Sequence, residues 1–374
     1  MKGLAIVSKG IENIASQEIK ELIGAKSRME EGCVMFDIKS LNDLCLLCYK
    51  SQSIDRAVYS IGSFTFSDFF NEFENFIKKT DFGGWLAKLK KFRVECIRAG
   101  SHDFKSTDVE KKCADFIKKH KSGFDFDSVS YKIIFLVYII NDKCYFGVDF
   151  SGFELNKRNY KVYLHPNSCR GTVAYALLRK SKFKRSETML DPFSRDGVIP
   201  IEAALYALNF PCNHYKKDKF AFLRLNIGID FAKFYSNIDK KIKKSKTKIC
   251  SYDHLFKYVD YSRKNAKIAG IEKQINFSRV DLEWLDIKFK KGSIDKIITR
   301  LPESKSTNKN KIYNEFFYQS EYILKANGSI ALISKMPEII KQHASKHNFI
   351  IVSEETIWSG SDQLNMMLLK KKSI

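Results

Sequence analysis

Residues 189–204 read MLDPFSRDGVIPIEAA: a short apolar strand with an acidic residue, Asp191, then a turn containing glycine, then an apolar helix. Two later strand-like segments also end in an acidic residue, with Asp253 after KICSY and Asp281 after INFSRV. Each acidic residue alone is a common way to end a strand. Three at successive strand ends indicate a sheet that binds a nucleoside-type cofactor at the carboxyl ends of its strands.

The segments around this stretch alternate between strand and helix patterns from about residue 186 onward, which predicts a doubly wound, mostly parallel sheet. The last two strand patterns are joined by a loop and not by a helix, so we expect them to be antiparallel. The expected strands are 189–193, 248–252, 275–280, 294–299, 329–335, 349–353 and 365–370, and the expected helices are 198–208, 255–269, 312–324 and 337–347.

The first 150 residues show a different order, with strands and helices that predict two small α+β units in succession. The first unit has the strand-helix-strand-helix order of a ferredoxin-like fold. The expected strands are 3–7, 33–38, 56–60, 91–97, 131–140 and 143–150, and the expected helices are 11–22, 41–50, 69–79 and 108–119.

The chain of 374 residues carries a net charge of +22, which favours a polyanionic partner and makes nucleic acid the first candidate. Residues 1–150 contain 23 Lys+Arg against 21 Asp+Glu, whereas residues 151–374 contain 42 against 22. A general lysine bias would spread evenly along the chain. The excess therefore indicates two differently built parts, and we interpret the lysines of the run 240–248 as the end of a surface helix.

The nine cysteines lack a repeating spacing, which argues against a disulfide framework or a zinc site. No apolar run is long enough to predict a membrane span, and the amino terminus lacks the pattern of a secretory signal. We therefore expect a cytoplasmic protein without a metal, and a monomer is favoured.

The stretch DPFSRDGVIPIEAA, residues 191–204, resembles the cofactor motif of class I S-adenosylmethionine-dependent RNA methyltransferases that carry a THUMP domain. The amino half agrees with this resemblance, since residues 92–106 are similar to the THUMP signature and GIENIASQEIKELIG to the preceding ferredoxin-like domain. Residues 155–160 and 165–174 resemble the connecting segment of the family. The likeness covers essentially the whole chain, and it is strongest to archaeal tRNA (guanine-N2) methyltransferases.

The resemblance implies four regions: a ferredoxin-like domain at 1–62, a THUMP RNA-binding domain at 63–155, a connecting segment at 156–186, and a Rossmann-like methyltransferase domain at 187–374. It implies S-adenosyl-L-methionine as cofactor and tRNA as partner. Its implied site residues are Asp191, Asp196, Gly197, Asp253 and Asp281 for the cofactor, Arg300, Pro302 and Glu303 for catalysis, and Arg98, His102 and Ser106 for RNA.

Two motifs depart from the family. The glycine turn has Arg195 where relatives have glycine, and this side chain could point outward and leave the site open or point inward and fill it. The catalytic motif, residues 299–304, has Arg300 where relatives have Asn or Asp, and an arginine has five donors and no acceptor for the target amine. Glu303 replaces an aromatic residue and could supply the acceptor instead.

Two functions therefore remain open at this point. The first is a methyltransferase acting on the exocyclic N2 of a guanine in tRNA, and the second is a catalytically inactive tRNA-binding protein that keeps the fold. A small-molecule methyltransferase would leave residues 1–155 without a use. The modified nucleotide, and mono- versus dimethylation, are not predicted by the sequence.

Overall fold

The computed structural model describes residues 1–303 and 309–372. These residues form two compact units, and each is built from separate stretches of chain. The first unit comprises Met1–Val7, Ala15–Leu155 and Lys216–Asn237, and the second comprises Ser8–Ile14, Asn156–Tyr215 and Ile238–Ile374.

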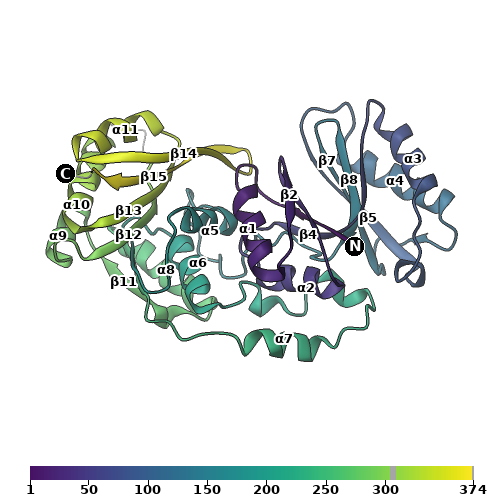
Figure 1. Cartoon of the computed structure of the whole chain (residues 1–374), viewed down its shortest axis with the longest axis horizontal. Coiled ribbons are helices and arrows are strands. Elements are labelled where there is room, and N and C mark those ends of the chain that lie inside the picture. Colours follow the sequence, from purple (N-terminus) through teal and green to yellow (C-terminus); the bar gives the residue numbers. More distant parts are fainter. Residues whose placement is uncertain (304–308, 373–374) are drawn as a thin grey trace. The chain divides into compact units, whose positions relative to one another are not determined.

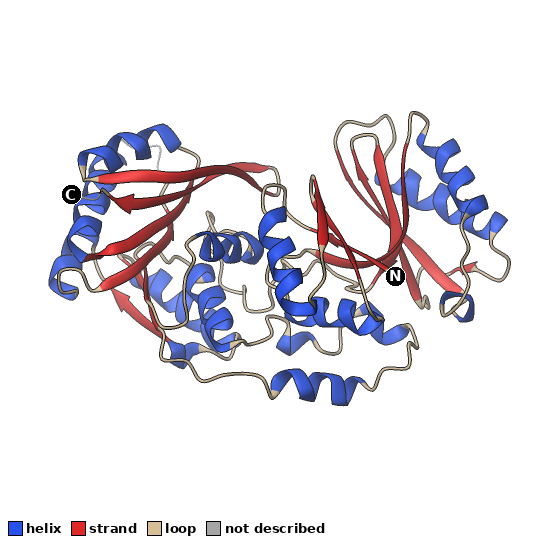
Figure 2. Ribbon diagram, viewed as in Figure 1, coloured by secondary structure: helices blue, strands red, loops and turns tan. Residues whose placement is uncertain are grey.

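One eight-stranded sheet runs through the first unit (Figure 2). Its strands lie in the order β2-β3-β1-β4-β8-β7-β5-β6. The pairing is antiparallel except where β5 meets β6 and β7. The strands are β1 (Lys2–Ile6), β2 (Ser27–Glu30), β3 (Cys33–Asp37), β4 (Arg56–Thr65), β5 (Lys91–Ala99), β6 (Asp125–Phe126), β7 (Ile133–Ile140) and β8 (Lys143–Asp149), and the helices of this part of the chain are α1 (Glu12–Ile23), α2 (Leu41–Lys50), α3 (Phe69–Lys79) and α4 (Ser106–His120).

The sequence IIFLVYII explains the centre of this sheet. All eight residues of β7 are buried, and β-branched residues favour a pleated strand that is covered on both faces. The strand β4 pairs with β1 on one side and with β8 on the other. The two α+β units that the sequence predicts in succession therefore share a single sheet.

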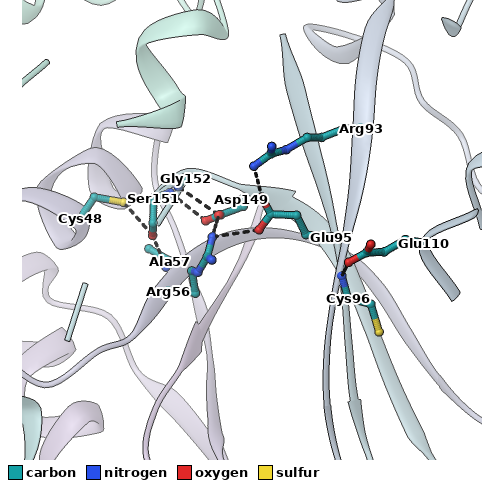
Figure 3. A network of polar contacts seen from close by, with 10 residues as sticks. All are labelled: Cys48, Arg56, Ala57, Arg93, Glu95, Cys96, Glu110, Asp149, Ser151 and Gly152. Atoms are coloured by element: carbon teal, nitrogen blue, oxygen red, sulfur yellow. Dashed lines mark hydrogen bonds and ion pairs between the residues drawn. The ribbon is translucent and has the colours of Figure 1, made fainter. Parts of the chain in front are cut away.

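A buried polar network ties the two parts of this sheet together (Figure 3). Arg56 of β4 pairs with Asp149 of β8, and its Nη1 lies 3.3 Å from Glu95 Oε2 of β5. The backbone N–H of Ser151 donates to Asp149 Oδ1 over 2.8 Å, and Ser151 Oγ accepts from the N–H of Ala57 over 2.8 Å. Because a buried guanidinium needs a paired anion, this network fixes β4 against β8.

The second unit has a seven-stranded sheet in the order β11-β10-β9-β12-β13-β15-β14. The first five strands in this order are parallel, and β15 is antiparallel to both of its neighbours, as predicted for the closing pair. In Figure 1 helices α5, α6 and α8 lie on one side of this sheet and α9–α11 on the other. The strands are β9 (Thr188–Asp191), β10 (Lys248–Asp253), β11 (Ile275–Arg279), β12 (Ile294–Arg300), β13 (Leu324–Ser334), β14 (Phe349–Ser359) and β15 (Asp362–Lys371), and the helices are α5 (Gly171–Lys180), α6 (Val198–Leu208), α8 (Phe256–Ile268), α9 (Leu285–Lys288), α10 (Lys309–Ile323) and α11 (Pro337–Lys346).

The connecting segment is clamped to α6 by a buried ion pair. Arg158 Nε donates to Glu202 Oε1 over 2.7 Å, and the hydroxyl of Tyr160 donates to the same oxygen over 2.6 Å. Both charged side chains of this pair are fully buried. The resemblance of residues 155–160 to a family segment therefore has a structural basis, since these residues fix the start of the second unit.

Several features differ from the sequence-based expectations, and the short strands β2 and β6 are among those that were not predicted. Helix α5 lies within the connecting segment, and a further helix, α7 (Phe231–Asp239), follows α6. The expectation of a surface helix ending in the lysine run is wrong: α7 ends at Asp239, and residues 240–247 are a turn and a loop. The closing strands are longer than predicted and form a tight hairpin around residues 360–361.

All nine cysteines are free thiols. In the ranges 1–303 and 309–372 no group of three or more His, Cys, Asp or Glu side chains is placed to hold a metal ion. No helix within the same ranges is both long and apolar enough to cross a lipid bilayer.

Candidate active site

The predicted cofactor carboxylates lie at the carboxyl edge of the parallel strands. Asp191 ends β9 and Asp253 ends β10, and the two side chains are 1% and 3% exposed. Asp281 follows β11 and is exposed, next to Trp284, whose side chain is also exposed. The parallel register places Ser251 opposite Asp191, so Asp253 extends two residues beyond it.

Asp191 is held by the end of β12, where the predicted catalytic segment begins. Its Oδ1 accepts a hydrogen bond from Thr299 Oγ1 over 2.6 Å and one from the N–H of Phe193 over 3.2 Å. Burial raises the pKa of Asp191 to about 7, which the two hydrogen bonds oppose. The sequence did not indicate this role for Thr299, and only the parallel pairing of β9 with β12 brings it to this carboxylate.

Gly197 is required at the start of α6 for two reasons. Its φ of +82° is the left-handed conformation that glycine adopts without strain. A Cβ atom added there would lie 2.1 Å from Ser262 Oγ of α8. The turn therefore needs glycine both for its backbone conformation and for the close approach of α6 to α8.

Arg195 points inward. Its backbone N–H donates to Asp253 Oδ2 over 3.0 Å, and its side chain is buried. The guanidinium donates from Nη1 to the carbonyl of Asn167 over 3.2 Å and from Nη2 to the carbonyl of Leu301 over 3.1 Å. Its φ is +51°, which is unfavourable for a residue with a side chain.

Asp196 contacts the connecting segment. Its Oδ2 accepts from the N–H of His165 over 3.4 Å, and its own carbonyl accepts from Asn265 Nδ2 over 2.9 Å. Asn265 Oδ1 in turn accepts from the N–H of Tyr163 over 3.0 Å. Asn265 of α8 thus ties the connecting segment to the glycine turn, a role for which the sequence carried no signal.

The predicted catalytic segment, residues 299–304, begins in the last two residues of β12. Arg300 Nη2 lies 3.0 Å from Glu303 Oε1, and both side chains are largely buried. The carbonyl of Pro302 accepts from the hydroxyl of Tyr313 over 2.7 Å, which anchors this segment to α10. Ser304, the last residue of the predicted motif, lies outside the described residues.

Two buried polar atoms of this region have no hydrogen-bond partner among the described residues: Ser194 Oγ in the glycine turn and Arg300 Nε at the end of β12. Buried polar atoms are normally paired, so an unpaired one at a site is a position where a bound ligand can supply the partner. His165 lies in the same region, and burial together with the positive charge of Arg195 lowers its pKa to about 4.

The predicted RNA-binding residues lie in the first unit, around the loop between β5 and α4. Arg98 Nη1 lies 3.2 Å from His102 Nδ1, and His102 Nε2 lies 2.7 Å from the carbonyl of Asn141. Because a carbonyl only accepts, Nε2 carries the proton and Nδ1 accepts from Arg98. Ser106 begins α4.

His102 lines a hollow of about 1460 Å³ on this side of the first unit. The ring of His102 stacks on Phe104, with ring centroids 5.0 Å apart. Phe66 and Phe70 also line the hollow, together with five aspartates and two lysines. The aromatic rings suit unpaired bases, which stack on such rings, whereas the excess of aspartates does not suit phosphates.

Comparison with known families matches the two parts of the chain to two different family models. A family model for the RMKL-like methyltransferase domain matches residues 158–364, and a model for the THUMP domain matches residues 67–149. The chain therefore belongs to the RMKL-like methyltransferase family and carries a THUMP domain ahead of the methyltransferase domain. The doubly wound, mostly parallel sheet predicted from the residues and the class I methyltransferase fold implied by the resemblance are both confirmed.

Two archaeal relatives are similar along nearly the whole chain. The tRNA (guanine(6)-N2)-methyltransferase of Methanocaldococcus jannaschii is 28% identical, covering 95% of this chain and 96% of the relative. The protein of the same name from Archaeoglobus fulgidus is 23% identical over 95% of this chain and 88% of the relative. Among solved structures, SMU.472 complexed with SAH superposes with a TM-score of 0.80 at 19% identity, covering 100% of this chain and 98% of that one.

Proposed function

We propose that this chain transfers a methyl group from S-adenosylmethionine to the exocyclic N2 of a guanine in tRNA, with guanine 6 as the target. The supporting sequence evidence is the methyltransferase family, the THUMP domain and two full-length relatives that bear this name. The structural observation that carries the proposal is the bond between Thr299 and Asp191, because it joins the predicted catalytic segment to the predicted cofactor turn. A cytoplasmic, monomeric protein, as the sequence predicts, is part of the proposal.

The residues at the strand ends fit a nucleoside-type cofactor. Ser194 Oγ is a buried hydroxyl that lacks a described partner, and it lies in the turn that faces the predicted cofactor. Asp253 would hold the ribose hydroxyls and Asp281 the adenine. Asp191 and Gly197 would border the methionine part, and Asp196 supports the turn through its contacts with the connecting segment.

When bound, S-adenosylmethionine supplies an electrophilic methyl group, and the guanine amine that accepts it loses a proton to water. The task of the protein is to orient the amine, which needs a hydrogen-bond acceptor beside it. Arg300 cannot accept, and Glu303 can. The ion pair with Arg300 holds the carboxylate of Glu303 at the end of β12, so we assign orientation of the amine to Glu303 and positioning of Glu303 to Arg300.

Recognition of tRNA is divided between the two units in this proposal. His102 lines the aromatic hollow of the THUMP part, Arg98 contacts His102, and Ser106 begins the helix that follows; the rings of the hollow suit the unpaired end of the acceptor stem. Nearly all of the excess positive charge lies after residue 150, where it suits the phosphates of the RNA body.

The test is methyl transfer to an unmodified tRNA transcript compared with the same transcript carrying inosine at position 6, because inosine lacks only the 2-amino group. We expect transfer to the first transcript and none to the second. Equal transfer to both would place the methyl group elsewhere. The catalytically inactive alternative requires that neither transcript is methylated while tRNA still binds.

A further inference from the structure

Arg195 is a buried cation without a partner anion. It is 7% exposed, and no carboxylate among residues 1–303 and 309–372 forms an ion pair with its guanidinium within 4 Å. Its two side-chain hydrogen bonds go to the backbone carbonyls of Asn167 and Leu301. A second cation, Arg300, lies close enough to lower the pKa of Arg195, to which burial contributes most.

The carboxylates near Arg195 are each held by a group other than its guanidinium. Glu303 is paired with Arg300, Asp191 accepts from Thr299 and from the N–H of Phe193, and Asp253 receives the backbone N–H of Arg195 and not its side chain. Burying an unpaired charge is unfavourable, so the arrangement suits an anion that arrives with a ligand. A phosphodiester of an RNA backbone does not reach a side chain that is buried under the connecting segment and the residues after β12. The anion therefore belongs to a small molecule bound in the glycine turn.

We propose that Arg195 binds the carboxylate of the methionine part of S-adenosylmethionine, and that without this carboxylate the same guanidinium fastens the catalytic segment through the carbonyl of Leu301. The inference rests on the proposed function, since that carboxylate is the only anionic group of the proposed cofactor. Under this proposal Arg195 connects the cofactor site with the predicted catalytic segment. Binding of the cofactor draws the guanidinium from Leu301 and releases the segment that contains Arg300 and Glu303.

The contribution of the carboxylate is measured with two neutral thioethers, S-adenosylhomocysteine and 5′-methylthioadenosine, which share the adenosine part. Only the first has the amino-acid part with its carboxylate. We expect Arg195→Gln to weaken S-adenosylhomocysteine binding by roughly tenfold to a hundredfold, as for other hydrogen bonds to charged groups, and to leave 5′-methylthioadenosine binding within twofold. Arg195→Lys keeps the charge and should retain part of the discrimination.

The matched control is Arg28→Gln, which removes a guanidinium that is 78% exposed in the first unit and should change neither affinity. Thermal unfolding of each variant establishes that it is folded. The inference is overturned if Arg195→Gln weakens both ligands equally, or if it strengthens S-adenosylhomocysteine binding, which would make Arg195 an obstruction. If the unchanged protein binds neither ligand, the proposed function fails as well, so the two failures are distinguishable.

The link to the catalytic segment has its own readout in tRNA binding. S-adenosylhomocysteine should raise the affinity for tRNA by about fivefold or more, and 5′-methylthioadenosine should not. In Arg195→Gln this coupling should disappear, because the segment is already released. Coupling of equal size with both ligands, or coupling that persists in Arg195→Gln, would contradict a role for Arg195 in joining the two sites.

Discussion

Replacing Gly197 with alanine tests why the turn before α6 needs glycine. The φ of +82° costs a residue with a side chain roughly 1–2 kcal/mol, and the new Cβ would lie 2.1 Å from Ser262 Oγ, an overlap of the kind that costs roughly 1–3 kcal/mol. We therefore expect Gly197→Ala to lower the free energy of unfolding of the second unit by about 2–5 kcal/mol. Gly292→Ala is the control, since Gly292 has a φ of +61° and its nearest atom, the Cα of Lys325, is 4.0 Å away.

The assay is urea unfolding followed by tryptophan fluorescence in a Trp85→Phe background, because Trp284 and Trp358 then both report the second unit. Ser262→Gly removes the Cβ and Oγ that the alanine would meet, so the double variant should be less destabilised than the sum of the two single variants. If Gly197→Ala costs no more than Gly292→Ala, the close approach of α6 to α8 is not what requires glycine here.

Three further predictions concern a buried carboxylate, a buried ion pair and a charged loop. Burial raises the pKa of Asp191 to about 7 from an unfolded value near 4, so the wild type should lose about 4 kcal/mol of stability as the pH rises from 4 to 7. Asp191→Asn should remove this loss in urea unfolding. The explanation would be contradicted if Asp191→Asn showed the same dependence of stability on pH as the wild type. Glu202→Gln leaves the fully buried Arg158 without its anion and should lower the free energy of unfolding by about 3–5 kcal/mol, and a loss below about 1 kcal/mol would mean that the clamp on α6 is dispensable. Lys243 and Lys244 are exposed in the loop before β10, and replacing both with glutamate should weaken tRNA binding and reduce the slope of log affinity against log salt by about one for each phosphate that the loop no longer neutralises. Lys20→Glu in the first unit should change neither quantity. An unchanged slope in the double variant would mean that these two lysines do not contact the RNA.

The departures from the family motifs are physically connected. Arg195 lies in the glycine turn and Arg300 at the end of β12, about a hundred residues apart in the chain, and Glu303 is paired with Arg300. The guanidinium of Arg195 reaches the carbonyl of Leu301, between these last two residues. Compared position by position with the family, the departures look like separate losses. In the structure they form one arrangement, and each is best tested together with the others.

The sequence predicted the fold of the second unit well, because its strands and helices are long and strongly patterned. The acidic residues at the strand ends followed from the same pattern, since parallel strands bring their carboxyl ends to one edge. The inward direction of the Arg195 side chain could not be predicted from the sequence, because it depends on a backbone φ of +51° and on two carbonyls supplied by distant segments. The bond between Thr299 and Asp191 was missed for the same reason.

The first unit was harder to predict in its organisation than in its elements. Apart from the short strands β2 and β6, which were not predicted, its strands and helices lie where the periodicity places them. The pairing of β4 with β8, however, joins segments about 90 residues apart and unites two expected units in one sheet. The excursion of residues 216–237 into the first unit had no local signal either. The local sequence pattern predicts secondary structure, whereas the pairing of strands that are far apart in the chain depends on the packing of the whole core.

The most direct measurement is nucleoside analysis by mass spectrometry of an unmodified tRNA after incubation with this protein and S-adenosylmethionine. We predict N2-methylguanosine at position 6, formed only when the protein and the cofactor are both present. A tRNA that binds the protein tightly and yields no methylated nucleoside, or yields one methylated on another base, would contradict the proposed function.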